Sequence, residues 1–307
     1  MSAQRDAWGE TLVEIAGVDQ RVVVVDGDLA NSTKADLFAA AHPERFVEIG
    51  IAEQNMVGVA FGMSTLGYRP WLSSFAVFLT HRALDQVRML VSQTRANVKI
   101  AGSYSGLLNG SSGKTHQDIE DLAIMRAMPG MTVLAPADEH EMRAATRWAA
   151  EHDGPVYLRI ARDAVDPVFG ASDVLDPTSP TVIVEGHELT IVSTGVQTSR
   201  CVQAVELLRE RGLDPRLVHV PMLKPVDGPA LLDLVGSGPI VTVEEHSIIG
   251  GLGSLVSELV AESGRGGPVL RIGLDDAWSE SGPSGFLLDK YGLSPRRVVE
   301  RVLRWRS

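Results

Sequence analysis

A single acidic residue stands in a segment that is otherwise apolar or uncharged. Residues 50–58 read Gly-Ile-Ala-Glu-Gln-Asn-Met-Val-Gly, and Glu53 is their only charged side chain. A carboxylate in the first turn of a helix can simply complement the helix dipole. It can also hold a ring nitrogen of a flat heteroaromatic ligand if aromatic side chains stack on that ring. Phe75, Phe78 and His81 could supply the stacking, because their spacing predicts one aromatic face of a helix. The alternative for these three residues is ordinary core packing.

The elements that would position these side chains alternate between strand and helix. The run Val22–Val25 is β-branched and apolar on both faces, which is typical of a buried parallel strand. Repeated alternation of this kind favours a parallel sheet covered by helices on both faces. The strands are predicted near residues 22–25, 98–101, 133–134 and 156–160, and the helices near residues 52–66, 81–92 and 139–151.

A change of texture follows residue 160 and predicts a second domain. Three X-Pro pairs fall between residues 166 and 180, and proline disfavours helix in the residue before it. We therefore expect two doubly wound α/β domains with mostly parallel sheets, at residues 1–165 and 187–307, joined by a linker at 166–186. The second domain should contain strands near residues 189–193, 216–220, 240–244 and 269–272, and helices near residues 198–211, 253–263 and 295–304.

Composition limits the kinds of partner that this protein can have. Its 307 residues suit two domains. A net charge of −11 excludes the basic footprint of a nucleic-acid-binding protein and a polybasic membrane-binding stripe. The lone Cys201 excludes an internal disulfide. No apolar run approaches the roughly 20 residues of a membrane span, and the polar N-terminus does not resemble a signal peptide. These features predict a soluble cytoplasmic protein.

Several short motifs, in their order along the chain, resemble the C-terminal half of a transketolase over essentially the whole length. Gly50–Gly58 resembles the segment whose glutamate holds N1′ of the thiamin aminopyrimidine. Residues 75–81 resemble the ring-stacking segment of that family. The other matching motifs are Thr115-His116-Gln117, Asp121-Leu122-Ala123, Pro136-Ala137-Asp138, Lys224-Pro225-Val226-Asp227, Glu244-Glu245-His246-Ser247, Gly250-Gly251-Leu252-Gly253 and Ser279-Glu280-Ser281-Gly282.

The resemblance implies a thiamin-diphosphate enzyme that transfers a two-carbon ketol unit from a ketose to an aldose. Glu53 and His116 would be its catalytic residues. Carried over residue by residue, the cofactor-binding positions are Asp28, Ile51, Glu53, Phe75, Phe78 and His81. The substrate-binding positions are Arg5, Ser32, Tyr104, Ser112, His116 and Arg162. Arginine binds phosphate through a planar fork of donors, so a phosphorylated sugar is expected at Arg5 and Arg162.

The resemblance also implies a partner subunit. Domains that bind the thiamin diphosphate group carry Gly-Asp-Gly and a later metal-sharing Asn. Here Leu29 follows Gly27-Asp28, and Asn55 already belongs to the glutamate segment, so we expect no metal ligand in this chain. The diphosphate and its Mg²⁺ would be held by a separate diphosphate-domain subunit. This chain would then be the β-type subunit of an α2β2 heterotetramer that is active only with its partner.

Two substitutions depart from the family pattern and leave alternatives open. Tyr104 and Ser112 stand where transketolases commonly have His and Asp, which favours a substrate other than ordinary pentose phosphates. One alternative is the β subunit of a 2-oxoacid dehydrogenase E1 component, although the segment 115–122 favours the transketolase branch. Another is a non-catalytic regulatory subunit, although Glu53 with Phe75 and Phe78 argues against it.

Overall fold

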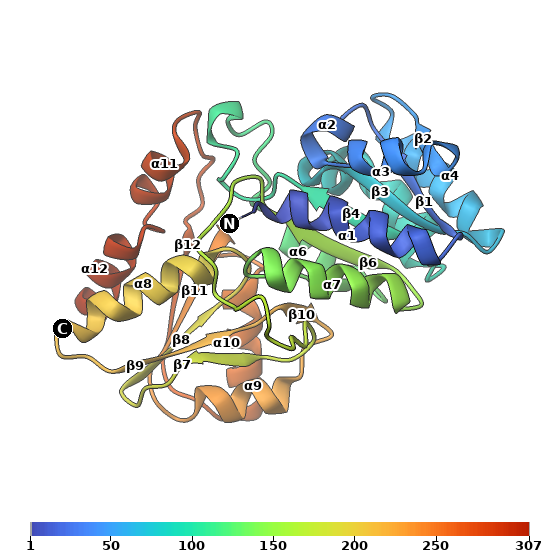
Figure 1. The fold of residues 1–307 in the computed structure, drawn as a ribbon. Coiled ribbons are helices and arrows are strands. Elements are labelled where there is room, and N and C mark those ends of the chain that lie inside the picture. Colours follow the sequence, from blue (N-terminus) through green and yellow to red (C-terminus); the bar gives the residue numbers. More distant parts are fainter. Residues whose placement is uncertain (1, 307) are drawn as a thin grey trace.

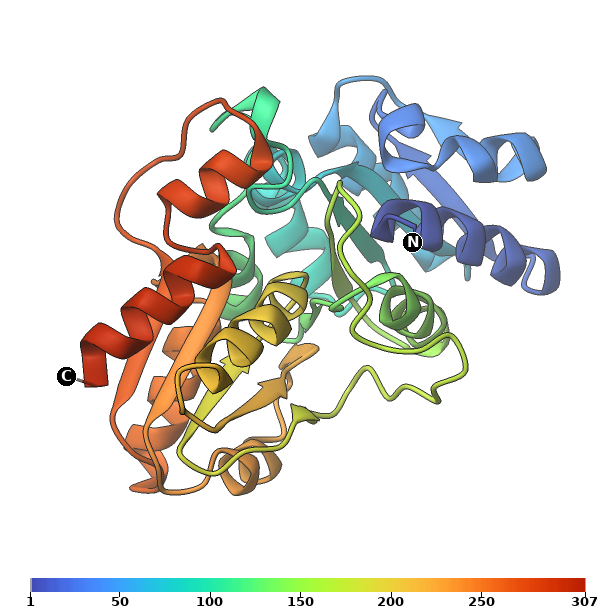
Figure 2. The same ribbon diagram turned by 60° about the vertical axis from the view of Figure 1, so that its left-hand side comes forward.

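Two sheets organise the chain, and helices cover both faces of each (Figures 1 and 2). The computed structural model describes residues 2–306. The first sheet has seven strands in the order β10-β5-β6-β4-β3-β1-β2, and all its neighbours are parallel except β10, which is antiparallel to β5. Its strands are β1 (Val22–Asp26), β2 (Phe46–Glu48), β3 (Arg69–Phe75), β4 (Lys99–Ser103), β5 (Thr132–Leu134), β6 (Val156–Ile160) and β10 (Met222–Lys224).

The helices around the first sheet divide between its two faces. On one face, α1 (Gln4–Val18), α3 (Asp36–Ala41) and α7 (Glu139–Glu151) bury a core that includes Trp8 and Trp71. On the other face, α4 (Glu53–Thr65), α6 (Asp121–Ala127) and two π-helical segments, η2 (Phe78–Arg82) and η3 (Val87–Ser92), bury a second core. Four short elements complete this part: α2 (Ala30–Thr33), η1 (Pro43–Arg45), α5 (Leu84–Gln86) and η4 (Gly110–Ser112).

The second sheet has five strands in the order β12-β11-β8-β9-β7, of which only the edge strand β7 is antiparallel. Helices α8 and α12 pack on one of its faces, and α9 and α10 share a core with the first sheet. The strands are β7 (Thr181–Val184), β8 (Leu189–Ser193), β9 (Pro215–His219), β11 (Ile240–Ser247) and β12 (Val269–Leu274). The helices are α8 (Gln197–Arg209), α9 (Gly228–Val235), α10 (Leu252–Ser263), α11 (Ser284–Lys290) and α12 (Pro295–Arg306).

The predicted fold class, two doubly wound and mostly parallel α/β units, is confirmed by this topology. One local prediction is wrong: Phe75 and Phe78 do not lie on one helix. Phe75 ends strand β3, and Phe78 begins the π-helical segment η2. The local spacing was misleading because β3 is the centre of a hydrogen-bonded ladder with β1 and β4, and sheet pairing fixes the strand up to Phe75. In addition, β10 follows the predicted linker but pairs with the first sheet.

Buried charges join the two units next to the motifs that resemble transketolases. Arg159 donates two hydrogen bonds to the carboxylate of Asp121, at 2.7 and 3.0 Å, and one to the backbone oxygen of Glu245 at 3.0 Å. The Glu245 carboxylate pairs with Arg200 and accepts from the backbone amides of residues 107–108 at 2.6 and 3.2 Å. The second unit therefore holds the start of the long loop that follows β4.

Candidate functional site

Glu53 begins helix α4 and is almost fully buried, with 1% of its surface exposed. Its Oε2 accepts a hydrogen bond from Nη1 of Arg82 at 2.8 Å, whereas its Oε1 is buried and has no partner within the described residues. A buried carboxylate oxygen without a partner is costly, because the water it lost has not been replaced. This oxygen is therefore the first indication that a ligand or another chain completes the site.

Arg82 is a functional candidate that the sequence analysis missed. Its guanidinium carbon lies 4.6 Å from the ring centre of Phe78, and its backbone oxygen accepts from the side-chain amide of Gln54 at 3.1 Å. Phe78 and Arg82 bound the π-helical segment η2, so both side chains lie on one side of it. The four-residue spacing from Phe78 could have indicated this pair, since residues i and i+4 face the same way on a helix.

Aromatic rings form a continuous strip beside Glu53. Phe75 stacks on Phe78 at 5.7 Å between ring centres and on Tyr104 at 4.0 Å, with interplanar angles of 21° and 18°. The His116 ring meets Phe78 edge-on at 5.4 Å and Phe75 at 6.0 Å. The structure thus brings together Phe75, Phe78, Tyr104 and His116, which arise from three separate segments of the chain.

His81 lies apart from this strip. Its Nε2 is 2.8 Å from Oε2 of Glu120, its Nδ1 is 2.8 Å from the Thr80 hydroxyl, and its side chain is 41% exposed. No ring contact joins it to Phe75 or Phe78 among the described residues, so its place at the cofactor stays a prediction.

Tyr104 has a strained backbone and two cationic neighbours. Its φ of 63° lies in the left-handed region, which costs a non-glycine residue about 1–3 kcal/mol and is often found at functional sites. The Tyr104 hydroxyl accepts from Nη1 of Arg5 at 2.7 Å, and the guanidinium carbons of Arg5 and Arg162 both lie 5.6 Å from its ring centre. The Tyr104 hydroxyl, followed by the Asp163 carboxylate, raises the pKa of Arg162, which therefore stays cationic.

The other predicted substrate residues surround the same region. The backbone oxygen of Ser32 accepts from Nη1 of Arg5 at 2.9 Å. The Ser112 hydroxyl donates to the Asn109 side chain at 2.9 Å, and residue 112 is exposed on the loop. Arg5, Ser32, Tyr104 and Arg162 therefore form one connected cluster, whereas the hydrogen bond of the Ser112 side chain stays within its own loop.

The predicted cofactor residues Asp28 and Ile51 lie on two loops that Glu48 connects. One oxygen of Glu48 accepts from the backbone amides of Asp28 at 2.9 Å and Gly50 at 2.7 Å. Asp28 has a φ of 64°, and Ile51 is 73% exposed immediately before α4. Such an exposed apolar side chain beside a buried carboxylate is consistent with a contact outside this chain. Glu48 had no motif in the sequence that could have revealed this role.

Two buried carboxylates anchor the loops of the site. Burial, more than any other cause, raises the pKa of Asp26 to about 6, and its Oδ1 accepts from the backbone amide of Leu29 at 2.8 Å. Burial and then the neighbouring Asp121 raise the pKa of Asp118 to about 6. Asp118 accepts from the Thr80 hydroxyl, so it ties the end of the long loop to the π-helical segment.

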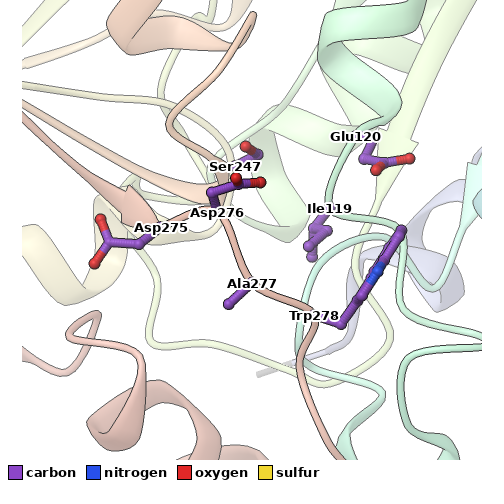
Figure 3. A pocket seen from close by; sticks show the side chains of 7 residues that line it. All are labelled: Ile119, Glu120, Ser247, Asp275, Asp276, Ala277 and Trp278. Atoms are coloured by element: carbon purple, nitrogen blue, oxygen red, sulfur yellow. The ribbon is translucent and has the colours of Figure 1, made fainter.

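A separate hollow of about 150 Å³ lies between the two units (Figure 3). Its lining includes Glu120, Asp275, Asp276 and the indole of Trp278, which is 59% exposed. In Figure 3 the Asp275 carboxylate points away from Glu120, so these acidic groups do not converge on one point. Within residues 2–306, no group of three or more His, Cys, Asp or Glu side chains is arranged to hold a metal ion.

The residues of the strip fit an aminopyrimidine. A flat ring can stack on Phe75 and Phe78, and the unpartnered Oε1 of Glu53 can accept or donate at a ring nitrogen. The mouth of the site offers Arg5, Arg162 and His116 for oxygen-rich groups. The arrangement thus combines an aromatic surface, a buried acid and cations, which suits a heteroaromatic cofactor and an anionic substrate.

Two family profiles match the chain: "Transketolase, pyrimidine binding domain" over residues 1–167 and "Transketolase, C-terminal domain" over residues 181–298. A 6-deoxy-6-sulfo-D-fructose transketolase subunit from Clostridium sp. (strain MSTE9) is 36% identical over 96% of this chain and 92% of its own length. This chain belongs to the transketolase family. Another relative, one of the subunits of an apulose-4-phosphate transketolase from Phocaeicola vulgatus, is 34% identical over 99% of this transketolase chain and 98% of its own length.

Solved structures agree with this assignment. A split-gene transketolase described as an inactive β4 tetramer is 44% identical to this transketolase chain, with a TM-score of 0.90 over 99% of this chain and 98% of its own. The transketolase of Campylobacter jejuni shares the fold at a TM-score of 0.82 and 23% identity, over 46% of its own chain. In the described part of this transketolase, no helix is both long and apolar enough to cross a membrane.

Proposed function

We propose that this chain is the pyrimidine-domain subunit of a split, thiamin-diphosphate-dependent transketolase. It would transfer a two-carbon ketol unit from a ketose to an aldose. The observation that carries this proposal is the buried Oε1 of Glu53, which has no partner within the described residues and lies at one end of an aromatic strip. Membership of the transketolase family and the split-subunit relatives support it. A cytoplasmic location is part of the proposal, in keeping with the single buried Cys201.

Each residue of the site has a role in this proposal. When bound, thiamin diphosphate supplies the nucleophilic carbon that takes up the ketol unit. Glu53 would hold or exchange a proton at N1′ of the aminopyrimidine, with Arg82 fixing its other oxygen. Phe75 and Phe78 would stack on the ring. His116, at the edge of both rings, would donate a hydrogen bond to oxygens of the ketose.

The diphosphate and its Mg²⁺ would be held by a partner subunit in an α2β2 heterotetramer. Two observations support a partner: the exposed Ile51 beside the buried Glu53, and relatives that are named as subunits. A related split transketolase forms a β4 tetramer described as inactive. We therefore expect this chain alone to be inactive and to bind thiamin diphosphate poorly.

Reconstitution with a subunit that carries the diphosphate domain tests the proposal. Ketol transfer should appear only in the mixture, and Glu53→Gln should reduce it by roughly 10²- to 10⁴-fold while the complex still elutes intact from a sizing column. Glu262→Gln is the matched control, because Glu262 is exposed on α10. Half of the wild-type rate in Glu53→Gln would refute the role of Glu53. Turnover of a 2-oxoacid with an artificial electron acceptor, without ketol transfer, would instead assign the chain to the 2-oxoacid dehydrogenase E1 alternative.

A further inference from the structure

A hollow of about 500 Å³ lies beside Arg162, between the long loop after β4 and the segment before α11. Residues 110–111 form one wall, and residues 281–284 of the second unit form the other. Figures 1 and 2 both show these segments, green and red, next to each other although they are far apart in the sequence. The second unit thus reaches the substrate side of the site.

The two walls of this hollow are fixed against each other. The backbone amide of Gly282 donates to the backbone oxygen of Gly110 at 3.0 Å. A Cβ on Gly110 would lie 2.3 Å from the backbone oxygen of Gly282, and a Cβ on Gly113 would lie 2.3 Å from the Ser281 hydroxyl. The Ser279 hydroxyl also bonds to the side chain of Gln117. Only glycine permits this approach, so the hollow is formed before any ligand arrives.

The polar groups of the hollow are hydrogen-bond donors around one cation. The Ser284 hydroxyl donates to Oδ2 of Asp163 at 3.1 Å, and Oδ1 of Asp163 accepts from Nη1 of Arg162 at 2.8 Å. The second unit therefore orients the carboxylate that orients Arg162. Within residues 2–306, the hydroxyls of Ser111 and Ser281 have no hydrogen-bond partner. A guanidinium with free hydroxyls beside it is a donor set suited to a tetrahedral oxyanion.

We propose that this hollow binds the terminal oxyanion of the sugar substrate, a phosphate or a sulfonate, and that the loop 281–284 of the C-terminal domain thereby selects the substrate. This inference rests on the proposed function, because Arg162 connects the hollow to the Tyr104 ring and through it to Phe75. The resemblance to transketolases gives the C-terminal domain a supporting role only. Here it supplies hydroxyls and orients a substrate-binding arginine.

Binding to the chain alone tests the hollow without turnover. Saturation-transfer NMR with glycerol 3-phosphate, 2,3-dihydroxypropane-1-sulfonate and glycerol should detect one or both oxyanions but not glycerol. Ser111→Trp, which fills the hollow from an exposed position, should abolish the signal, and Ser281→Ala with Ser284→Ala should weaken it. Ser263→Ala on α10 is the matched control, because its hydroxyl bonds only to its own helix and to Arg265. Equal binding of glycerol, or oxyanion binding that none of the variants changes, would overturn the inference.

Kinetics of the reconstituted complex test the selection of substrate. Losing hydrogen bonds to a charged group costs about tenfold or more in affinity, so the Ser281→Ala, Ser284→Ala variant should raise KM for a phosphorylated or sulfonated sugar by about that factor. The kcat should change little, and KM for the uncharged sugar should stay the same. An active complex whose KM is unaffected overturns this inference and leaves the proposed function standing. Oxyanion binding with no ketol transfer in any reconstitution overturns the proposed function but not the hollow.

Discussion

Removing the positive charge that faces Glu53 should destabilise the first unit measurably. In Arg82→Met the side chain keeps its length and loses its guanidinium, so Glu53, 1% exposed, would lose the one hydrogen-bond donor that its carboxylate has among the described residues. The buried charge would then be uncompensated, and the free energy of unfolding should fall. Glu53→Gln removes the charge instead, so it should cost much less.

The size of the effect follows from the unequal burial of the two partners. Breaking a fully buried ion pair from one side costs about 3–5 kcal/mol. The Arg82 side chain is 46% exposed, so water can approach the vacated position, and we reduce that loss to about 1.5–3 kcal/mol. Loss of the contact with the Phe78 ring adds about 0.5–1 kcal/mol. We therefore expect Arg82→Met to lower the free energy of unfolding by about 2–4 kcal/mol.

Urea unfolding of the isolated chain at pH 7.5 measures this loss. Tryptophan fluorescence is a suitable signal, since Trp8 and Trp71 are fully buried in the first unit. Arg147→Met is the matched control, because it breaks an exposed pair with Glu14 and should cost about 0.5 kcal/mol or less. In the Glu53→Gln, Arg82→Met double variant the loss should fall short of the sum by at least about 1 kcal/mol. Strictly additive losses, or a single variant as stable as the wild type, would refute the pair.

Three further predictions concern the substrate, pH and specificity. In the reconstituted complex, Arg5→Ala and Arg162→Ala should each raise KM for a phosphorylated substrate roughly 10- to 150-fold, and an equal rise for the unphosphorylated sugar would exclude a phosphate contact. Because burial raises the pKa of Asp118 to about 6 from an ordinary value near 4, the folded chain binds that proton more tightly than the unfolded chain. Its free energy of unfolding should therefore fall between about pH 4 and pH 6 and stay lower above pH 6; Asp118→Asn should gain up to about 2–3 kcal/mol at pH 7.5 and little at pH 4.5, and urea unfolding that shows equal gains would contradict the cause. Wild-type kcat/KM for xylulose 5-phosphate with ribose 5-phosphate should be weak and should rise in Ser112→Asp with Tyr104→His, whereas a wild-type value of about 10⁴ M⁻¹s⁻¹ or more would make both substitutions neutral.

Local sequence was sufficient for most of the elements. The β-branched run at Val22–Val25 formed β1 because such side chains favour extended backbone and a two-sided buried strand. Glu53 was predicted at the start of a helix, and the structure begins α4 there. The failures were non-local. The spacing of Phe75 and Phe78 suggested one helix, but pairing of β3 with its neighbours extends the strand to Phe75.

The sequence by itself determined the two α/β units, the family resemblance and the position of Glu53 along the chain, since periodicity, turn residues and motifs are all local. Only the tertiary structure decided which groups meet. Arg82 faces Glu53, Tyr104 joins the phenylalanine strip, and His81 pairs with Glu120 instead. It also decided that residues 281–284 stand beside residues 110–111. The physical reason is that such contacts join segments far apart in the chain, and their geometry is set by how two sheets pack around a shared core, which no local pattern encodes.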